Sequence, residues 1–151
     1  MKRPLGPVVM AAATALLCLV ALVAQVRESL DRRLASRLLA RAEAISIEVL
    51  SAGQAPRAVL SQNLRDLERA RRLDPLEVGV PLALGSQYLL LRRPQEAEAA
   101  YRDALTVEPR PEIYLNLGKA QLLAGERSAA DQSFHRAAVL DWHMREQIPA
   151  H

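Results

Sequence analysis

Three histidines carry the side chains best suited to metal binding or proton transfer in this chain. His135, His143 and His151 are spaced eight residues apart, which on a helix is about 12 Å along the axis. A single metal ion cannot bind two side chains that are so far apart. We therefore predict that the chain has no metal site and that these histidines are ordinary surface or structural residues.

Side chains suited to nucleophilic or phosphate chemistry are not arranged as a site either. The six glycines are scattered rather than gathered in a phosphate-binding loop. Glu96, Glu98 and Asp103 share a predicted helix with Arg102, which is typical of a solvent-exposed face with i,i+4 pairing. None of four serines has a general base at the spacing of a catalytic motif, and these are Ser61, Ser86, Ser128 and Ser133. The sequence thus predicts no catalytic residues, no cofactor and no enzyme.

A pattern of small, apolar and aromatic residues recurs with one fixed offset of 33 positions. Tyr88 has Gln121 at the same offset, so one position departs from the pattern. A fixed period in this range indicates stacked helical hairpins rather than one globular catalytic core. The matching pairs are Leu84 and Leu117, Gly85 and Gly118, Ala97 and Ala130, Tyr101 and Phe134, and Ala104 and Ala137.

These residues resemble the tetratricopeptide repeat, a family of helix-turn-helix units of about 34 residues. The resemblance covers residues 44–142, with clear units at 78–110 and 111–142 and a degenerate unit at 44–77. It implies an all-α fold, a short α-solenoid of antiparallel helix hairpins. The repeat-packing residues that it implies are Gly85, Tyr88, Ala97, Tyr101, Ala104, Gly118, Ala130, Phe134 and Ala137.

Each class of packing residue has an expected role. We expect Gly85 and Gly118 where two helices cross closely, and the alanines where the second helix approaches the first. Tyr101 and Phe134 are expected to fill the gaps between neighbouring repeats. The sequence departs from the family at Pro81, where a large aromatic residue is usual.

In this family the first helices of successive units line a concave groove. Asn116 and Lys119 alone resemble the clamp that holds a partner's terminal carboxylate in some members. We therefore expect an apolar groove that accepts a helix or an extended peptide. The alternative is that the chain's own helices cover its leucines. The groove residues are Leu82, Ser86, Leu89, Leu115, Asn116, Lys119 and Leu122.

An uncharged segment of 20 residues, 7–26, precedes the repeats. As a helix it spans about 30 Å, the thickness of the hydrocarbon core of a bilayer. We predict a transmembrane helix over 7–26 after a short basic tail at 1–6. A cleaved signal peptide, with a weak site at Leu22-Val23-Ala24, is the alternative.

The flanking charges argue in both directions about orientation. Lys2 and Arg3 precede the segment, and a short basic amino terminus usually stays inside the cell, whereas several arginines follow it. We expect a single-pass protein of a bacterial inner membrane with its repeats on the periplasmic side.

The remaining residues are predicted as helices joined by short turns. An amphipathic helix is predicted from Val26 to Leu50, continuous with the membrane segment. Residues 27–43 of it are the juxtamembrane segment, and Gly53 is expected to end the helix. Trp142, just before a tail over 143–151, and Met144 and Ile148 within that tail are expected either to fold over the open edge of the last repeat or to leave it for a partner. The expected helices are 56–73, 77–91, 94–107, 111–124 and 126–140.

Charge distribution excludes one further class of partner. Residues 27–72 carry ten basic and six acidic groups, a net charge of +4, and residues 73–151 carry eight and eleven, a net charge of −3. A nucleic-acid-binding protein would show a denser basic face with interleaved aromatics. We therefore predict that nucleic acid is not a partner of this protein.

Two functions follow from these patterns. The first is a membrane-anchored scaffold that holds a partner polypeptide near the membrane through the groove. The second is a structural accessory subunit of a larger membrane complex, or a homo-oligomer.

Overall fold

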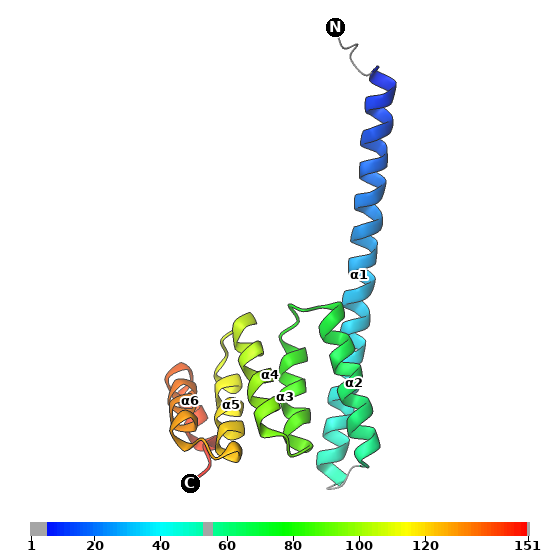
Figure 1. Cartoon of the computed structure of the whole chain (residues 1–151). Coiled ribbons are helices and arrows are strands. Elements are labelled where there is room, and N and C mark those ends of the chain that lie inside the picture. The colour runs from blue at the N-terminus through cyan, green and yellow to red at the C-terminus, as the bar shows by residue number, and fades with distance from the viewer. Residues whose placement is uncertain (1–5, 53–55, 151) are drawn as a thin grey trace.

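The computed structural model describes residues 6–52 and 56–150, and within them the chain is helical without a strand. This confirms the all-α prediction. Residues 1–5 of the predicted tail, the predicted helix stop at Gly53, and His151 lie outside the described residues. The helices are α1 (Pro7–Ala52), α2 (Arg57–Leu73), α3 (Gly79–Leu90), α4 (Pro94–Val107), α5 (Pro111–Ala124), α6 (Arg127–Leu140) and the 3-10 helix η1 (Trp142–Gln147) (Figure 1).

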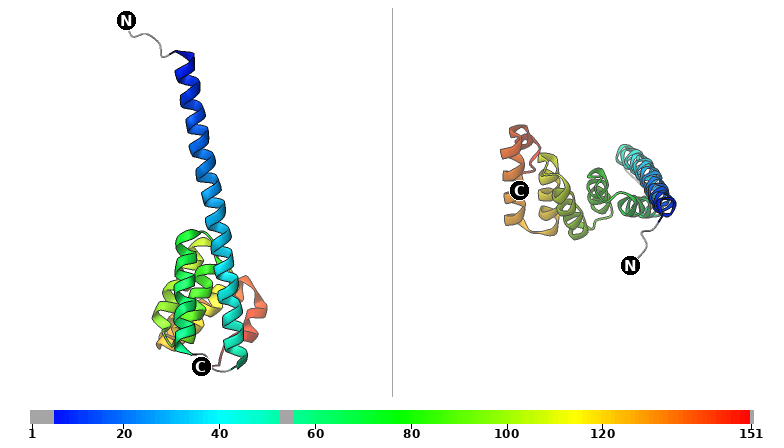
Figure 2. Two further views of the ribbon diagram at one scale, coloured as in Figure 1. Left: turned by 90° about the vertical axis from the view of Figure 1, so that its right-hand side faces the viewer. Right: turned by 90° about the horizontal axis from the view of Figure 1, so that it is seen from above.

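The first helix is continuous over 46 residues and joins the apolar segment to the repeats. No glycine or proline occurs between residues 8 and 52, so nothing in the sequence interrupts its backbone hydrogen bonds. Its N-terminal half extends beyond all the other helices (Figure 2), and its large side chains there are exposed. The apolar segment and the amphipathic segment are therefore one element.

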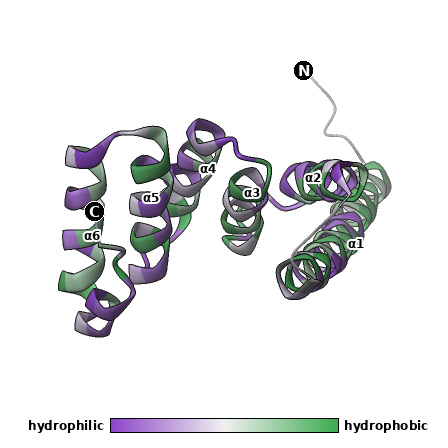
Figure 3. Ribbon diagram, turned by 90° about the horizontal axis from the view of Figure 1, so that it is seen from below, coloured by the Kyte–Doolittle hydropathy of each residue, from purple (hydrophilic) through white to green (hydrophobic). Residues whose placement is uncertain are grey.

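The helices pair into three hairpins that stack side by side. α1 packs on α2, α3 on α4 and α5 on α6, and the contacts α2–α3 and α4–α5 join one hairpin to the next. Seen along the helices, α3 and α5 lie on one side and α2 and α4 on the other (Figure 3). This is the predicted solenoid of antiparallel hairpins.

Turn residues set the bounds of the central helices. Pro94 and Pro111 occupy the first turns of α4 and α5, where a missing N–H leaves no bond unmade. Gly125 ends α5 with a left-handed φ of 86°, and Glu126 N donates to Gln121 O at 2.8 Å. α4 and α5 have the bounds expected from the sequence, while the other predicted helices differ by one or two residues at their ends.

The glycines of the repeat accept an aromatic ring from the second helix of the same hairpin. A Cβ added at Gly85 would lie 2.6 Å from Tyr101 Cζ, and one added at Gly118 would lie 2.6 Å from Phe134 Cδ1. Only a residue without a side chain leaves room for the ring. The close approach is therefore between a helix backbone and a ring, and the fully buried residues beside the rings are Ala97, Ala104, Ala130 and Ala137.

The core of the first hairpin starts before residue 44. Ala35 and Ala42 of α1 are buried with Leu67 of α2 and Leu84 of α3. The juxtamembrane segment 27–43, which was expected to lie outside the repeats, thus supplies part of the repeat core. Small residues at these two positions let α2 and α3 approach α1 closely.

A buried polar network also ties this hairpin to the next one. Asn63 Nδ2 donates to Gln87 Oε1 at 2.9 Å and to Ala42 O at 3.1 Å. Gln87 Nε2 donates to Leu60 O at 3.2 Å. Because buried amides need partners, these bonds fix the position of α3 against α1 and α2.

The C-terminal segment covers only part of the open edge. Met144 and Ile148 pack against the cluster around Phe134. Trp142 is 63% exposed, with its ring centroid 3.7 Å from that of His143. Trp142 therefore does not fold over the edge, because η1 turns its first residue outward while Met144 and Ile148 face α5 and α6.

Candidate partner-binding face

Three of the expected groove residues lie on α3 at positions i, i+4 and i+7, so they share one side of the helix. Leu82, Ser86 and Leu89 are half-buried. Leu82 and Leu89 pack against the cluster that contains Tyr101 and Ile113. The leucines are therefore partly covered by α4 and α5 and partly available to a ligand.

Ser86 connects this side of α3 to the buried ring beneath it. Its Oγ donates to Leu82 O at 3.2 Å and lies 3.3 Å from Tyr101 Oη. Burial raises the pKa of Tyr101 to about 12. Since the ring stays neutral, the floor of this face carries no charge from Tyr101.

One of the expected groove residues on α5 is in the core. Leu115 is 3% exposed and packs with Ala130 and Phe134, so its prediction as a groove residue is wrong. The physical reason is that α6 covers this side of α5. Leu122 is half-buried in the same cluster, beside Met144 and Ile148 of the C-terminal segment.

Asn116 and Lys119 are half-exposed on α5, and the sequence reasoning missed a third residue beside them. Leu123 is 58% exposed and lies four residues after Lys119, one turn further along the same side. The sequence places two leucines together at 122 and 123. Leu122 packs against the cluster around Phe134, whereas Leu123 is exposed, and the sequence alone does not tell them apart.

The residues available to a ligand on the first helices of the two clear hairpins form what we call the α3/α5 face. It combines apolar side chains with two neutral polar groups and one cation. Such a surface fits an apolar helix or extended peptide better than a free carboxylate. Its members are Leu82, Ser86 and Leu89 on α3 and Asn116, Lys119 and Leu123 on α5.

Two hollows lie on the opposite side, between the second helices. One of about 160 Å³ is lined by Leu84 and Tyr88 of α3 with residues of α2 and α4. The other, of about 370 Å³, is lined by Leu117 and Gln121 of α5 with residues of α4 and α6. They lie one repeat apart, since Leu117 and Gln121 follow Leu84 and Tyr88 by 33 positions.

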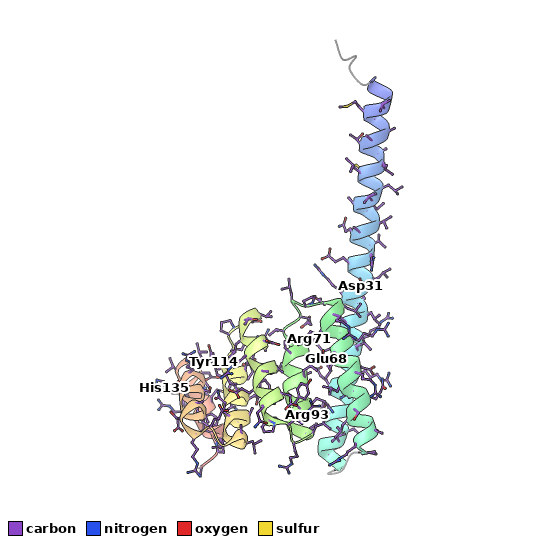
Figure 4. The ribbon with its side chains drawn as sticks, viewed as in Figure 1. Asp31, Glu68, Arg71, Arg93, Tyr114 and His135 are labelled. Carbon is purple, nitrogen blue, oxygen red and sulfur yellow. The ribbon has the colours of Figure 1, made fainter. Side chains whose placement is uncertain are left out.

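Ion-paired side chains line the smaller hollow. Arg71 bridges Glu68 at 3.0 Å and Asp103 at 3.5 Å, and Figure 4 shows Glu68 and Arg71 side by side on α2. Burial, followed by the charge of Glu68, raises the pKa of Tyr88. Arg93 lies 5.0 Å above the Tyr88 ring. The charged groups that line this hollow thus already have partners on α2, α3 and α4.

The histidines are not brought together. His135 is exposed on α6 near Tyr114 (Figure 4), and His143 Nδ1 lies 3.0 Å from Asp141 Oδ1. Across residues 6–52 and 56–150, no group of three or more His, Cys, Asp or Glu side chains is placed to hold a metal ion.

Solved structures show which known fold this architecture matches. A thermophilic tetratricopeptide-repeat protein, TTC0263 from Thermus thermophilus, superposes with a TM-score of 0.66 and is 26% identical, covering 80% of this chain and 69% of its own. The second tetratricopeptide-repeat domain of Spaghetti (RPAP3), bound to the HSP90 peptide SRMEEVD, superposes with a TM-score of 0.62 at 17% identity, covering 73% of this chain and 94% of its own.

The chain has the tetratricopeptide-repeat fold. It matches no family model and no curated protein by sequence, so the likeness rests on the fold and the 33-residue pattern together. The repeat protein accommodates its main departure from the family easily. Pro81 is buried in the first turn of α3, where proline is tolerated.

Proposed function

We propose that the repeat protein is a membrane-anchored scaffold that holds a partner polypeptide on the α3/α5 face. The observation that carries the proposal is a stack of hairpins with a half-exposed apolar and polar face. The neighbour that binds an HSP90 peptide supports a peptide or protein as the class of partner.

The anchor part of the proposal rests on α1. It is long and apolar enough to cross a membrane, and none of its apolar window is buried inside the protein. The helix of a soluble core would be covered by other helices, whereas here the leucines and valines from residue 9 to residue 30 are exposed. A bilayer would remove this apolar surface from water.

Alkaline extraction of membranes from the native host tests the anchor. The full chain should stay in the membrane pellet, and its intact mass should include residues 1–24. A soluble protein that begins at residue 25 would mean that the apolar segment is a cleaved signal.

A second function, a structural accessory subunit, is supported by the exposed alanines of α1 at residues 11–13, 15 and 21, which permit close helix packing in a membrane. Purification in mild detergent separates the two functions. A scaffold should be released as a single species, whereas an accessory subunit should remain with a complex of fixed composition.

A further inference from the structure

We propose that the outer side of the first hairpin is a binding surface for an acidic helical segment of a partner protein. This surface is distinct from the α3/α5 face. We call it the arginine ladder, and all of its side chains are exposed. Its members are Arg33, Arg37 and Arg41 on α1 and Arg65, Arg69 and Arg72 on α2.

The register of α1 against α2 places these arginines level with one another in pairs. Asn63 Nδ2 donates to Ala42 O at 3.1 Å, and Arg41 Nη1 lies 3.7 Å from Asp66 Oδ2. Because the helices are antiparallel, residues whose numbers add to about 106 lie at one height. The three rungs, separated by about 6 Å, are Arg33 with Arg72, Arg37 with Arg69, and Arg41 with Arg65.

The rungs point away from the core. On a helix with 3.6 residues per turn, Arg37 lies about 140° around α1 from the buried Ala42. By the same measure Arg69 lies about 160° around α2 from the buried Leu67. Since α3 packs on the buried side of both helices, the ladder forms the free end face of the solenoid.

Almost no negative charge balances the ladder. Of the two carboxylates beside it on α2, Asp66 is only 14% exposed and already pairs with Arg41. Glu68, three residues after Arg65 and four before Arg72, pairs with Arg71 instead. The next carboxylate on that stripe of α1, Glu48, lies about 10 Å beyond Arg41. Within the described residues no ion pair is recorded for Arg33, Arg37, Arg69 or Arg72, whereas their neighbours Arg32 and Arg71 pair with Glu28 and Glu68.

An acidic helix matches both the charge and the spacing. Glutamates at every fourth residue of a helix rise by about 6 Å per step, the same distance as the rungs. Each carboxylate can then meet one rung and form charge-assisted hydrogen bonds with guanidinium groups.

A lipid surface fits less well, on an argument that rests on the proposed membrane span. Arg37 and Arg41 lie 11 and 15 residues beyond Val26, about 16 and 22 Å from the end of the apolar segment. The headgroup layer is only about 6 Å thick, and charge is screened over about 8 Å at physiological salt. A bilayer crossed by α1 can therefore meet only the first rung.

A nucleic acid also fits less well. The first hairpin contains no aromatic residue on which bases could stack. The ladder therefore provides the positive charge of a surface that binds single-stranded nucleic acid, but not the aromatic side chains on which its bases stack.

The test measures peptide binding to the full-length chain in nanodiscs of zwitterionic lipid. The probe is a fluorescent helical peptide with Glu at every fourth position, and its control carries Gln instead. We expect the Glu peptide to bind at least about tenfold more tightly than the Gln peptide at low salt, and Arg37→Glu with Arg69→Glu to remove that preference. Arg127→Glu with Arg145→Glu, two exposed arginines at the far end, is the matched control and should change binding less than about twofold.

Each outcome decides the proposal. Equal losses in the ladder and control variants would overturn it, because the attraction would then be non-specific. Anionic nanodiscs that abolish peptide binding, or a single-stranded oligonucleotide that binds more tightly than the peptide, would reassign the ladder to lipid or nucleic acid. Arg37→Gln with Arg69→Gln, checked by circular dichroism, separates lost charge from lost folding. Lys119→Glu on the α3/α5 face should leave ladder binding unchanged, so failure of one surface is distinguishable from failure of the other.

Discussion

Glycine and an aromatic ring form one packing unit in each clear repeat. Tyr101 over Gly85 and Phe134 over Gly118 are both almost fully buried. The ring occupies space that any side chain on the glycine would need. The rings and glycines could therefore be predicted from their spacing, but their direct contact could not, because sequence spacing does not say which helix receives the ring.

Replacing Gly85 by alanine tests this contact. We expect Gly85→Ala to lower the free energy of unfolding by about 1–3 kcal/mol, since the added methyl overlaps the Tyr101 ring. Urea denaturation of the full chain in detergent measures it.

Gly79→Ala is the matched control for that substitution. Its added methyl meets the flexible end of Leu39 at 2.7 Å, which can rotate away. A loss at Gly79 as large as that at Gly85 would contradict the ring contact. A Tyr101→Ala background should make Gly85→Ala less damaging, because the obstructing ring is gone.

Alkaline pH should weaken the stack through Tyr101. Its pKa is raised from 10.0 to about 12 by burial, so the folded state holds this proton more tightly than the unfolded state does. The full contribution of this protonated hydroxyl to the free energy of unfolding is present below pH 10. It is lost as the pH rises from about 10 to 12, which lowers the free energy of unfolding by about 2–3 kcal/mol in total.

Denaturation midpoints measured between neutral pH and pH 11 check this dependence. Tyr101→Phe should make the alkaline decline shallower, with a remainder from Tyr88, whose pKa burial also raises. Tyr114→Phe, on a half-exposed ring, is the matched control and should change the slope less. If the pH dependence of the midpoint is unchanged in Tyr101→Phe, another group causes the loss of stability at alkaline pH.

The turns within the second and third hairpins are equivalent, but only one of them has glycine. Arg92 has a left-handed φ of 58° and stands 33 positions before Gly125, whose φ is 86°. In both turns the next residue closes the helix end, since Arg93 N donates to Tyr88 O at 2.9 Å and Glu126 N donates to Gln121 O at 2.8 Å. A side chain in this conformation is strained, whereas glycine is not.

Arg92→Gly is therefore expected to stabilise the protein by about 0.5–1 kcal/mol, and Gly125→Ala to destabilise it by about 1 kcal/mol. Thermal melts of the two variants in one detergent should move in opposite directions. A lower melting temperature for Arg92→Gly would mean that the arginine side chain, which is exposed, contributes more than its backbone conformation costs.

At the level of elements, the sequence predicted some bounds better than others for a physical reason. Pro94 and Pro111 fix the starts of α4 and α5, because proline suits only the first turn. The boundary placed at residue 44 had no such marker, and α1 crosses it while packing from Ala35 onward. Leu115 was expected in the groove but is buried, and the exposed Leu123 was not predicted at all. Coverage by α6 and η1 is a tertiary property that periodicity does not contain.

Across the whole molecule, α1 gives the scaffold its organisation. One continuous helix carries an exposed apolar segment at one end and the core of the first hairpin at the other (Figure 1). A helix has no joint where it has neither glycine nor proline. If α1 spans a bilayer, the stack is therefore held at a fixed distance and direction from that bilayer, with the α3/α5 face and the arginine ladder as separate surfaces.

The most direct test of the scaffold is site-specific photocrosslinking of the full chain in membranes of its native host. A photoreactive side chain at Lys119 or Leu123 should give a discrete adduct with one partner protein, while the same group at Gln132, exposed on the side of the second helices, should not. An adduct from Gln132 with none from Lys119 or Leu123 would contradict the account, because the partner would then lie on the opposite side of the stack.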